Sequence, residues 1–236
     1  SRIDEEMPDA ITLSGLLKDN GYTTISNGKV SHNSADMKHT WSEIWDPPQE
    51  VTWRNYKLEE NIENEKSKKE VPAYEAAMVD DDAYFDGQIA TKTISDLIKL
   101  KDDGKPFLLF SGFVKPHLPF NAPKKYWDLY DPTEIKFPIN KDFPSTAPKR
   151  AQTWYELTAY KDITKNVDVE EKLAKKLIHA YYACVSYIDA QIGRVLTALD
   201  ELGLAEDTIV ILTSDHGFSL SEHNRWSKHS LFKTEL

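Results

Sequence analysis

A carboxylate and an imidazole, Asp215 and His216, stand directly after the apolar run at 208–213. An uninterrupted run of β-branched and aliphatic residues is typical of a strand buried on both faces of a parallel sheet, which would place the pair at its carboxyl end. Open α/β sheets bind ligands at that edge. A carboxylate oxygen and a ring nitrogen are both good metal ligands, and Gly217 allows a sharp turn behind them. We therefore predict that Asp215 and His216 bind a metal ion in an ester-hydrolysing enzyme.

Lys29 and His32 follow a second predicted strand, the short β-branched segment at 22–26. They lie three residues apart beyond Gly28, so both side chains can reach one ligand above the sheet edge. Taken alone, an ordinary polar surface loop explains them better, because loops usually carry polar residues.

Lys115 and His117 follow a third predicted strand, the apolar segment at 106–113. Pro116 and Pro119 flank the histidine and restrict the backbone of this turn. An imidazole on a stiff strand end suits acid–base chemistry near neutral pH. The alternative is a histidine that is hydrogen-bonded into a loop and has no chemical role.

The segment after Gly217 carries many titratable side chains within a few residues, and solvation alone does not explain this density. They are Glu222, His223, Arg225, Lys228 and His229. If the three strands are parallel neighbours, their tips and Lys228 converge on one crevice. A cation, lysines that neutralise oxygen charges and imidazoles that carry protons are what hydrolysis of a phosphate or sulfate ester requires.

Helical periodicity and stop signals predict the elements between these tips. We expect helices at 8–20, 83–101, 124–130 and 168–202, alternating with the three strands. This order is typical of an α/β domain whose largely parallel sheet is flanked by helices. Cys184 falls on the apolar side of the longest helix, which indicates a core residue and not a nucleophile.

Residues 39–83 show little periodicity and are predicted to form an irregular surface excursion. The charges at 59–70 alternate in sign, as on a solvated face. Trp41, Trp45 and Trp53 leave open a second interpretation, in which the excursion packs down as a lid or a substrate wall.

Composition limits the class of protein. The 236 residues are 40% hydrophobic, enough for one sizeable domain or most of one. The formal net charge of -10 argues against general nucleic-acid binding. One cysteine excludes an internal disulfide framework, and no apolar run reaches the length of a membrane span.

Three motifs together resemble sulfatases of the alkaline-phosphatase-like superfamily. They are Ser214-Asp215-His216-Gly217, Gly28-Lys29-Val30-Ser31-His32 and Lys115-Pro116-His117. The Lys-x-x-His spacing of the second motif is similar to that of the iduronate-2-sulfatase branch, as are the helix phrase at 181–189 and the ending at 217–228. The resemblance covers residues 10 to 232, and it is poorest at 46–80.

This resemblance implies roles for the motif residues. Asp215 and His216 would bind a divalent cation, which is usually calcium in this family. Lys29 would bridge the sulfate and the nucleophile, which His32 would orient or deprotonate. His117 and Lys228 would hold the sulfate, with His117 protonating the leaving oxygen. Lys115 would lie at a substrate-binding position of the family, and the resemblance assigns it no firm role.

The same resemblance implies groups that this chain lacks. The family's nucleophile is a formylglycine made from a Cys/Ser-x-Pro-x-Arg motif, and two adjacent aspartates complete its metal site. Neither feature precedes Ile11. We therefore expect residues 1–236 to be the central part of a sulfatase catalytic domain, with missing N- and C-terminal parts of the same protein beyond Ser1 and Leu236.

A sulfated saccharide, such as a uronic acid of a glycosaminoglycan, is the substrate that the branch implies, with an exported or lysosomal location. Two alternatives stay open. One is phosphate or phosphonate ester hydrolysis on the same scaffold, and the other is a non-catalytic glycan-binding relative. A Cys or Ser ahead of x-Pro-x-Arg in the upstream sequence would favour the sulfatase, and a Thr the phosphoesterase.

The missing groups generate a prediction about the isolated chain. We expect the purified 236-residue polypeptide not to hydrolyse an aryl sulfate and to bind calcium weakly, because it supplies neither the nucleophile nor the two aspartates. A chromogenic aryl sulfate assay and calcium titration calorimetry test this. Turnover, or tight calcium binding, by this polypeptide would contradict it.

Overall fold

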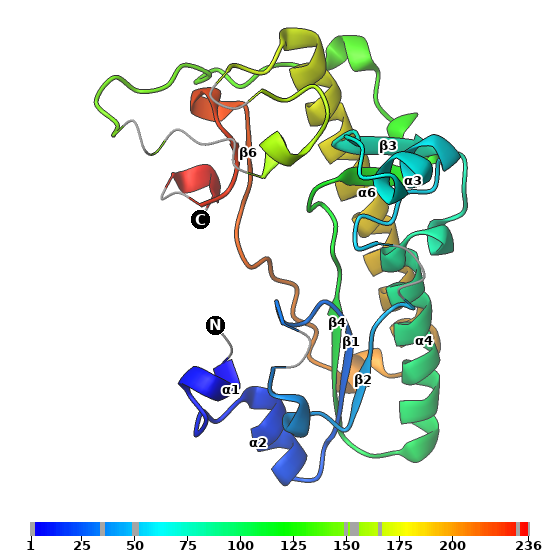
Figure 1. Ribbon diagram of the computed structural model, residues 1–236. Coiled ribbons are helices and arrows are strands. Elements are labelled where there is room, and N and C mark those ends of the chain that lie inside the picture. The colour runs from blue at the N-terminus through cyan, green and yellow to red at the C-terminus, as the bar shows by residue number, and fades with distance from the viewer. Residues whose placement is uncertain are drawn as a thin grey trace. The chain divides into compact units, whose positions relative to one another are not determined.

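The computed structural model describes residues 3–33, 36–48, 52–148, 151, 156–164, 167–229 and 232–235. The chain forms two compact units (Figure 1). Unit 1 comprises Ser1–Glu50, Asp80–Val114 and Ile188–Ile209, and unit 2 comprises Val51–Val79, Lys115–Tyr187 and Val210–Leu236. Among the described helices, none is both long and apolar enough to cross a membrane.

Unit 1 contains a three-stranded parallel sheet with the order β2-β1-β4. The central strand β1 (Thr23–Gly28) pairs with β2 (Glu43–Trp45) on one side and with β4 (Phe107–Gly112) on the other. In the register of the sheet, Asn27 lies opposite Ser111. The predicted strands at 22–26 and 106–113 are thus confirmed, as parallel neighbours.

Side chains alternate across β1 and bind a different element on each face. Thr24 donates a hydrogen bond from Oγ1 to the carbonyl oxygen of Thr40, 3.1 Å away, in the 3-10 helix η1 (Lys38–Thr40). The Thr40 hydroxyl lies 2.8 Å from that of Ser14 in α2 (Leu13–Asp19). Asn27 lies three residues after Thr24 in β1, and its side chain binds Asp96 in α4 (Phe85–Asp103). The period of two in the strand therefore places α2 and α4 on opposite faces of the sheet.

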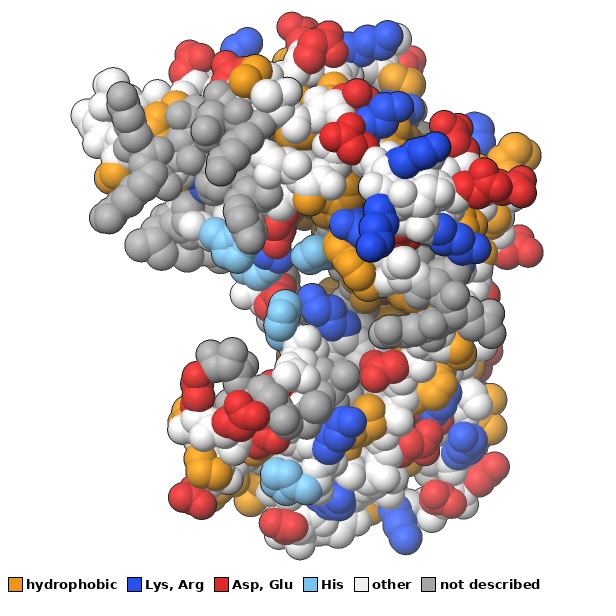
Figure 2. Space-filling view, in the orientation of Figure 1, with side chains coloured by type: hydrophobic (Ala, Val, Ile, Leu, Met, Phe, Trp, Pro, Cys, Tyr) orange, Lys and Arg blue, Asp and Glu red, His pale blue; other side chains and the backbone are white. Residues whose placement is uncertain are grey.

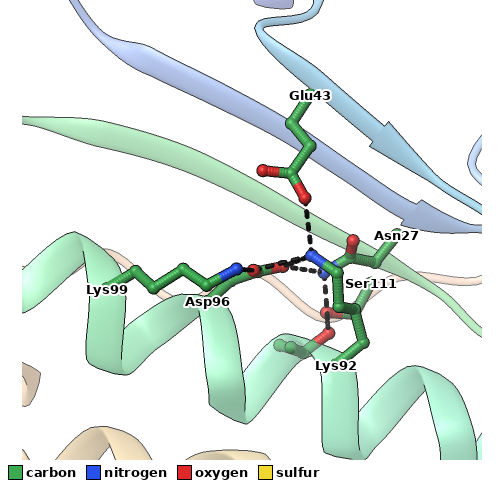
Figure 3. A network of polar contacts seen from close by, with 7 residues as sticks. Asn27, Glu43, Lys92, Asp96, Lys99 and Ser111 are labelled. Carbon is green, nitrogen blue, oxygen red and sulfur yellow. Dashed lines mark hydrogen bonds and ion pairs between the residues drawn. The ribbon is translucent and has the colours of Figure 1, made fainter.

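A buried carboxylate, Asp96, joins α4 to the sheet (Figure 3). It accepts hydrogen bonds from Asn27 Nδ2 at 2.8 Å and from Lys92 Nζ at 2.6 Å. The same Lys92 ammonium lies 2.7 Å from Glu43 in β2. Because an unpaired buried carboxylate is costly, these donors hold α4 in one register against β1 and β2.

Two glycines permit the close approach of β1 and β4 at their carboxyl ends. Gly28 has a φ of +72°, and the Lys29 N–H donates to the carbonyl oxygen of Gly112 at 2.8 Å. A Cβ at Gly112 would lie 2.2 Å from the carbonyl carbon of Lys29. Glycine is therefore required where the chain presents Lys29 at the sheet edge.

Unit 2 contains a two-stranded parallel sheet of β3 (Tyr74–Ala77) and β5 (Phe120–Pro123). The helix α5 (Lys124–Trp127) follows β5, as predicted. The first part of α6 (Glu171–Glu201) packs on these elements, with Phe120 edge-on to Tyr181 at 5.4 Å. Cys184 is fully buried, which confirms its place in the core.

The remaining elements are short. They are α1 (Ile3–Glu6), α3 (Glu59–Lys66), the antiparallel pair β6 (Ser219–Leu220) and β7 (Trp226–Ser227), and the 3-10 helices η2 (Asp81–Ala83), η3 (Pro132–Glu134), η5 (Leu157–Ala159), η6 (Ala205–Asp207), η7 (Glu222–Asn224) and η8 (Lys233–Glu235). Side chains of both charge signs are interspersed over the face shown in Figure 2.

The segment 39–83 has more regular structure than predicted. It contains β2, α3 and β3, and it is divided between the two units. Glu75, only 2% exposed, accepts hydrogen bonds from the backbone N–H groups of Lys57 and Leu58 at 2.7 and 2.9 Å and from Asn61 Nδ2 at 2.9 Å. Hydrogen bonds to this one buried carboxylate thus order a segment whose sequence has no apolar periodicity.

The prediction of a strand at 208–213 was wrong. The segment has no regular structure and joins η6 to the Asp215 turn as coil (Figure 1). Its apolar side chains are exposed, Ile209 at 89% and Ile211 at 79%. No described strand pairs with it, and a strand requires a backbone partner as well as an apolar sequence.

The first helix begins later than predicted. The prediction placed it at 8–20, but α2 starts at Leu13, because Thr12 adopts an extended backbone and its Oγ1 accepts the Gly15 N–H at 3.0 Å. Threonine is a favoured N-cap residue. The predicted helices at 83–101 and 168–202 are confirmed, within a few residues, as α4 and α6.

The close approach at Gly112 generates a stability prediction. Gly112→Ala should destabilise the chain by roughly 1–3 kcal/mol, because its Cβ meets backbone atoms of Lys29 that cannot rotate away. Urea denaturation measures the effect. Gly193→Ala is the control: this helix position has nothing within 4 Å, so alanine should stabilise by about 1 kcal/mol. Equal midpoints for the two variants would contradict the role of Gly112.

Candidate active site

His117 lies in the turn between β4 and β5, with its ring fixed by a main-chain acceptor. Its Nδ1 lies 2.7 Å from the carbonyl oxygen of Leu118. A carbonyl only accepts, so Nδ1 carries the proton in the neutral ring and Nε2 is unprotonated. The Lys115 ammonium donates to the carbonyl oxygens of His117 and Pro119 at 3.0 and 2.6 Å. Lys115 thus holds the turn, and the substrate contact predicted for it stays a prediction.

Three basic side chains meet at one carboxylate oxygen, and we call His117, Glu156, Lys228 and His229 the Glu156 cluster. Oε1 of Glu156 lies 3.0 Å from Lys228 Nζ, 3.6 Å from His229 Nε2 and 4.0 Å from His117 Nε2. The side chains of Glu156 and Lys228 are only 20% and 16% exposed. Partial burial strengthens such charge pairs relative to those on an open surface. The structure therefore brings together His117 and Lys228, as the sequence predicts.

The backbone around Lys228 is held in an unusual conformation. Ser227 and His229, on either side of it, have φ values of +72° and +78°. Trp226 and Ser227 are buried and pair in the β6–β7 ladder, which fixes the chain up to Lys228. Left-handed backbone in residues other than glycine persists only where its surroundings impose it. The ladder thus fixes the backbone position from which the Lys228 side chain reaches Glu156.

The pKa of His117 lies far below its ordinary value. Burial is the largest cause and lowers this pKa from 6.5 to about 4, opposed by the hydrogen bond to Leu118 and assisted by the charges of Lys228 and Lys115. The ring is therefore neutral at pH 7. An anion bound beside Lys228 would offset the positive charges and raise the pKa of His117.

The predicted metal ligands Asp215 and His216 bind within their own turn. Asp215 accepts the His216 backbone N–H at 3.0 Å, and its Oδ2 lies 3.6 Å from His216 Nε2. His216 Nδ1 lies 2.7 Å from the carbonyl oxygen of Gly217. Across the described part of the chain, no group of three or more His, Cys, Asp or Glu side chains could hold a metal ion. Two donors do not complete a divalent cation site, so the pair does not fit a cation by itself.

Lys29 and His32 belong to unit 1 and are both exposed. They lie after β1, at the edge where the Gly28–Gly112 contact ends the strand pair. His117, Lys228 and the Asp215 turn belong to unit 2, so the predicted convergence of all strand tips on one crevice stays a prediction.

No sequence pattern marks Glu156 as a site residue. It lies in the proline-rich stretch at 123–160, which has no periodic pattern, and nothing in its neighbours marks it. The sequence marks His229 only as one of several titratable residues after Gly217. The pairing of Glu156 with Lys228 and with His229 depends on contacts between segments far apart in the chain.

The chain matches one protein family over nearly its whole length. A family profile described as sulfatase matches residues 3–235. The chain belongs to the sulfatase family. This confirms the resemblance carried by the three motifs.

Among relatives of this sulfatase-family chain, the iduronate 2-sulfatases of Mus musculus and Homo sapiens are 34% and 33% identical to it over 94% of its length. The chain spans 42% of the length of each. Its fold is similar to that of a phosphonate monoester hydrolase from Silicibacter pomeroyi, with a TM-score of 0.68, 16% identity, and coverage of 96% of this chain and 51% of that one. The predicted α/β fold class is thereby confirmed.

The electrostatics of His117 generate a pH prediction. Its pKa should be about 4 in an NMR titration of the ring, and Lys228→Ala should raise it by removing a nearby positive charge. Since the unfolded ring binds protons more readily, this group's contribution to stability is present above pH 6.5 and is lost as the pH falls toward 4. A His117 pKa at or above 6.5 in the native chain would contradict this description.

Proposed function

We propose that the protein carrying this chain hydrolyses sulfate esters of sugars, with a uronic acid of a glycosaminoglycan as the substrate class. Family membership supports the chemistry, and the iduronate 2-sulfatase relatives support the saccharide. An exported or lysosomal location belongs to the same proposal.

The observation that carries the proposal is the shared oxygen of the Glu156 cluster. Lys228, His229 and His117 all lie within 4.0 Å of Glu156 Oε1. The Lys228 ammonium can bind an oxygen of a sulfate ester in place of the carboxylate oxygen, and His117 Nε2 becomes a second donor once it is protonated. Such preorganised donors stabilise the charge that develops on those oxygens in the transition state.

His117 supplies the proton in this proposal. The ring is neutral in the free chain, with Nδ1–H held by Leu118 and Nε2 directed at the anion position. Binding of an anionic ester beside Lys228 raises the pKa of His117, so that Nε2 takes up a proton. That proton then passes to the leaving alkoxide of the sugar.

Lys29 and His32 serve the nucleophile side of the same reaction. Lys29 pairs with the sulfate, and His32 orients or deprotonates the nucleophile. A formylglycine, the nucleophile that the family resemblance implies, would supply the hydroxyl that attacks sulfur. Asp215 and His216 would provide two ligands of the divalent cation that the resemblance implies.

Substitution in the full-length protein tests the two residues that the structure brings together. His117→Ala should lower kcat/KM for a sulfated uronate disaccharide by roughly 10²–10⁴-fold, as expected for loss of a general acid. Lys228→Ala should lower it by roughly 10²–10³-fold, as for loss of an oxyanion donor. Steady-state kinetics on both variants measure the effect.

Lys233→Ala and His39→Ala replace exposed side chains of the same types and serve as controls. Phosphate and phosphonate monoesters, assayed in parallel, test the alternative chemistry. Full activity of His117→Ala, or faster turnover of the phosphorus esters than of the sulfate ester, would overturn the proposal. Saccharide binding without any turnover would indicate the non-catalytic relative.

A further inference from the structure

An exposed tryptophan, Trp53, lies beside the ring of His117. The ring centroids are 6.2 Å apart and the planes are inclined at 77°, an edge-to-face arrangement. Trp53 is 51% exposed. Single exposed apolar side chains are common, so its location next to the Glu156 cluster is the informative feature.

Arg54 fixes the orientation of the indole. Its guanidinium carbon lies 4.7 Å from the centroid of the Trp53 ring and 5.6 Å from that of Tyr160. An ion pair with Glu65 at 3.0 Å holds the guanidinium in place. The planar cation therefore lies over one face of the indole and keeps the ring in one position.

The backbone beneath Trp53 is also anchored. The carbonyl oxygen of Arg54 accepts a hydrogen bond from Asn121 Nδ2 in β5 at 3.0 Å. Tyr56 is 1% exposed, and the Glu75 carboxylate binds the next two backbone N–H groups of the chain. Since each of these contacts is buried or partly buried, Trp53 stands on a rigid base.

We propose that Trp53 is the stacking platform for the sugar ring that carries the ester. The inference rests on the proposed function, because a sulfate held by His117 and Lys228 brings its sugar within reach of an indole 6.2 Å from His117. Pyranose rings have polar edges and apolar C–H faces, and an aromatic ring provides a matching apolar surface. The segment that carries Trp53 thus selects the saccharide and leaves the chemistry to the Glu156 cluster.

Trp53→Ala in the full-length protein separates saccharide recognition from chemistry. We expect KM for a sulfated uronate disaccharide to rise roughly tenfold and kcat to change by less than about twofold. Competitive inhibition by inorganic sulfate, which lacks a sugar, should be unchanged. Trp53→Phe should restore most of the affinity, and Met78→Ala, at an apolar position 87% exposed in the same unit, should behave as wild type.

The outcomes distinguish this inference from the function on which it rests. Wild-type turnover with an unchanged KM in Trp53→Ala would overturn the platform and leave the function standing. If the wild-type protein does not turn over the disaccharide, the proposed function fails, and NMR of the Trp53 indole N–H decides. A shift of this signal on disaccharide addition supports the platform, and an unmoved signal overturns it.

Discussion

The carboxylate of Glu156 is the interaction on which the arrangement of the candidate site depends. It joins the turn before β5, the chain ahead of α6 and the segment after β7 through a single oxygen. The partly buried Lys228 ammonium requires an anionic partner, and Glu156 provides it at 3.0 Å. In the proposed reaction the sulfate ester would compete with this carboxylate, so part of its binding free energy would go into displacing Glu156. Such a cost need not slow catalysis, since only interactions that are stronger in the transition state accelerate a reaction.

Buried carboxylates organise the rest of the fold in the same manner. Asp96 joins α4 to the sheet of unit 1, and Glu75 holds the turn ahead of α3 in unit 2. Each accepts hydrogen bonds from two or more segments, which satisfies its charge within the protein. Acidic residues in this chain therefore act as internal cross-links as well as surface charges. Replacing any one of them would leave several donors unpaired at once.

The sequence was informative where structure is local and uninformative where it is not. The long periodic helices at α4 and α6 and the strands β1 and β4 were predictable, because apolar spacing and glycine stop signals are local. His117, in the Lys115-Pro116-His117 motif, and Lys228, at the end of the similar stretch 217–228, were predicted to lie together; the structure places both beside Glu156, and their roles stay predictions. Glu156 was not predictable, since only tertiary contacts mark it. The strand prediction at 208–213 was wrong because an apolar sequence shows which side chains can be buried, but does not show whether a partner strand is present.

That run has a consequence for the physical behaviour of the chain. Ile209, Val210, Ile211 and Leu212 are between 55% and 89% exposed, in a stretch free of charge and proline. Unpaired backbone with β-branched side chains is a template on which a second copy can add a strand. We therefore expect a polypeptide that leaves this run uncovered to self-associate more readily at high concentration than one in which the run is covered. Colloidal stability, and not only the chemistry at the site, therefore depends on what covers these residues.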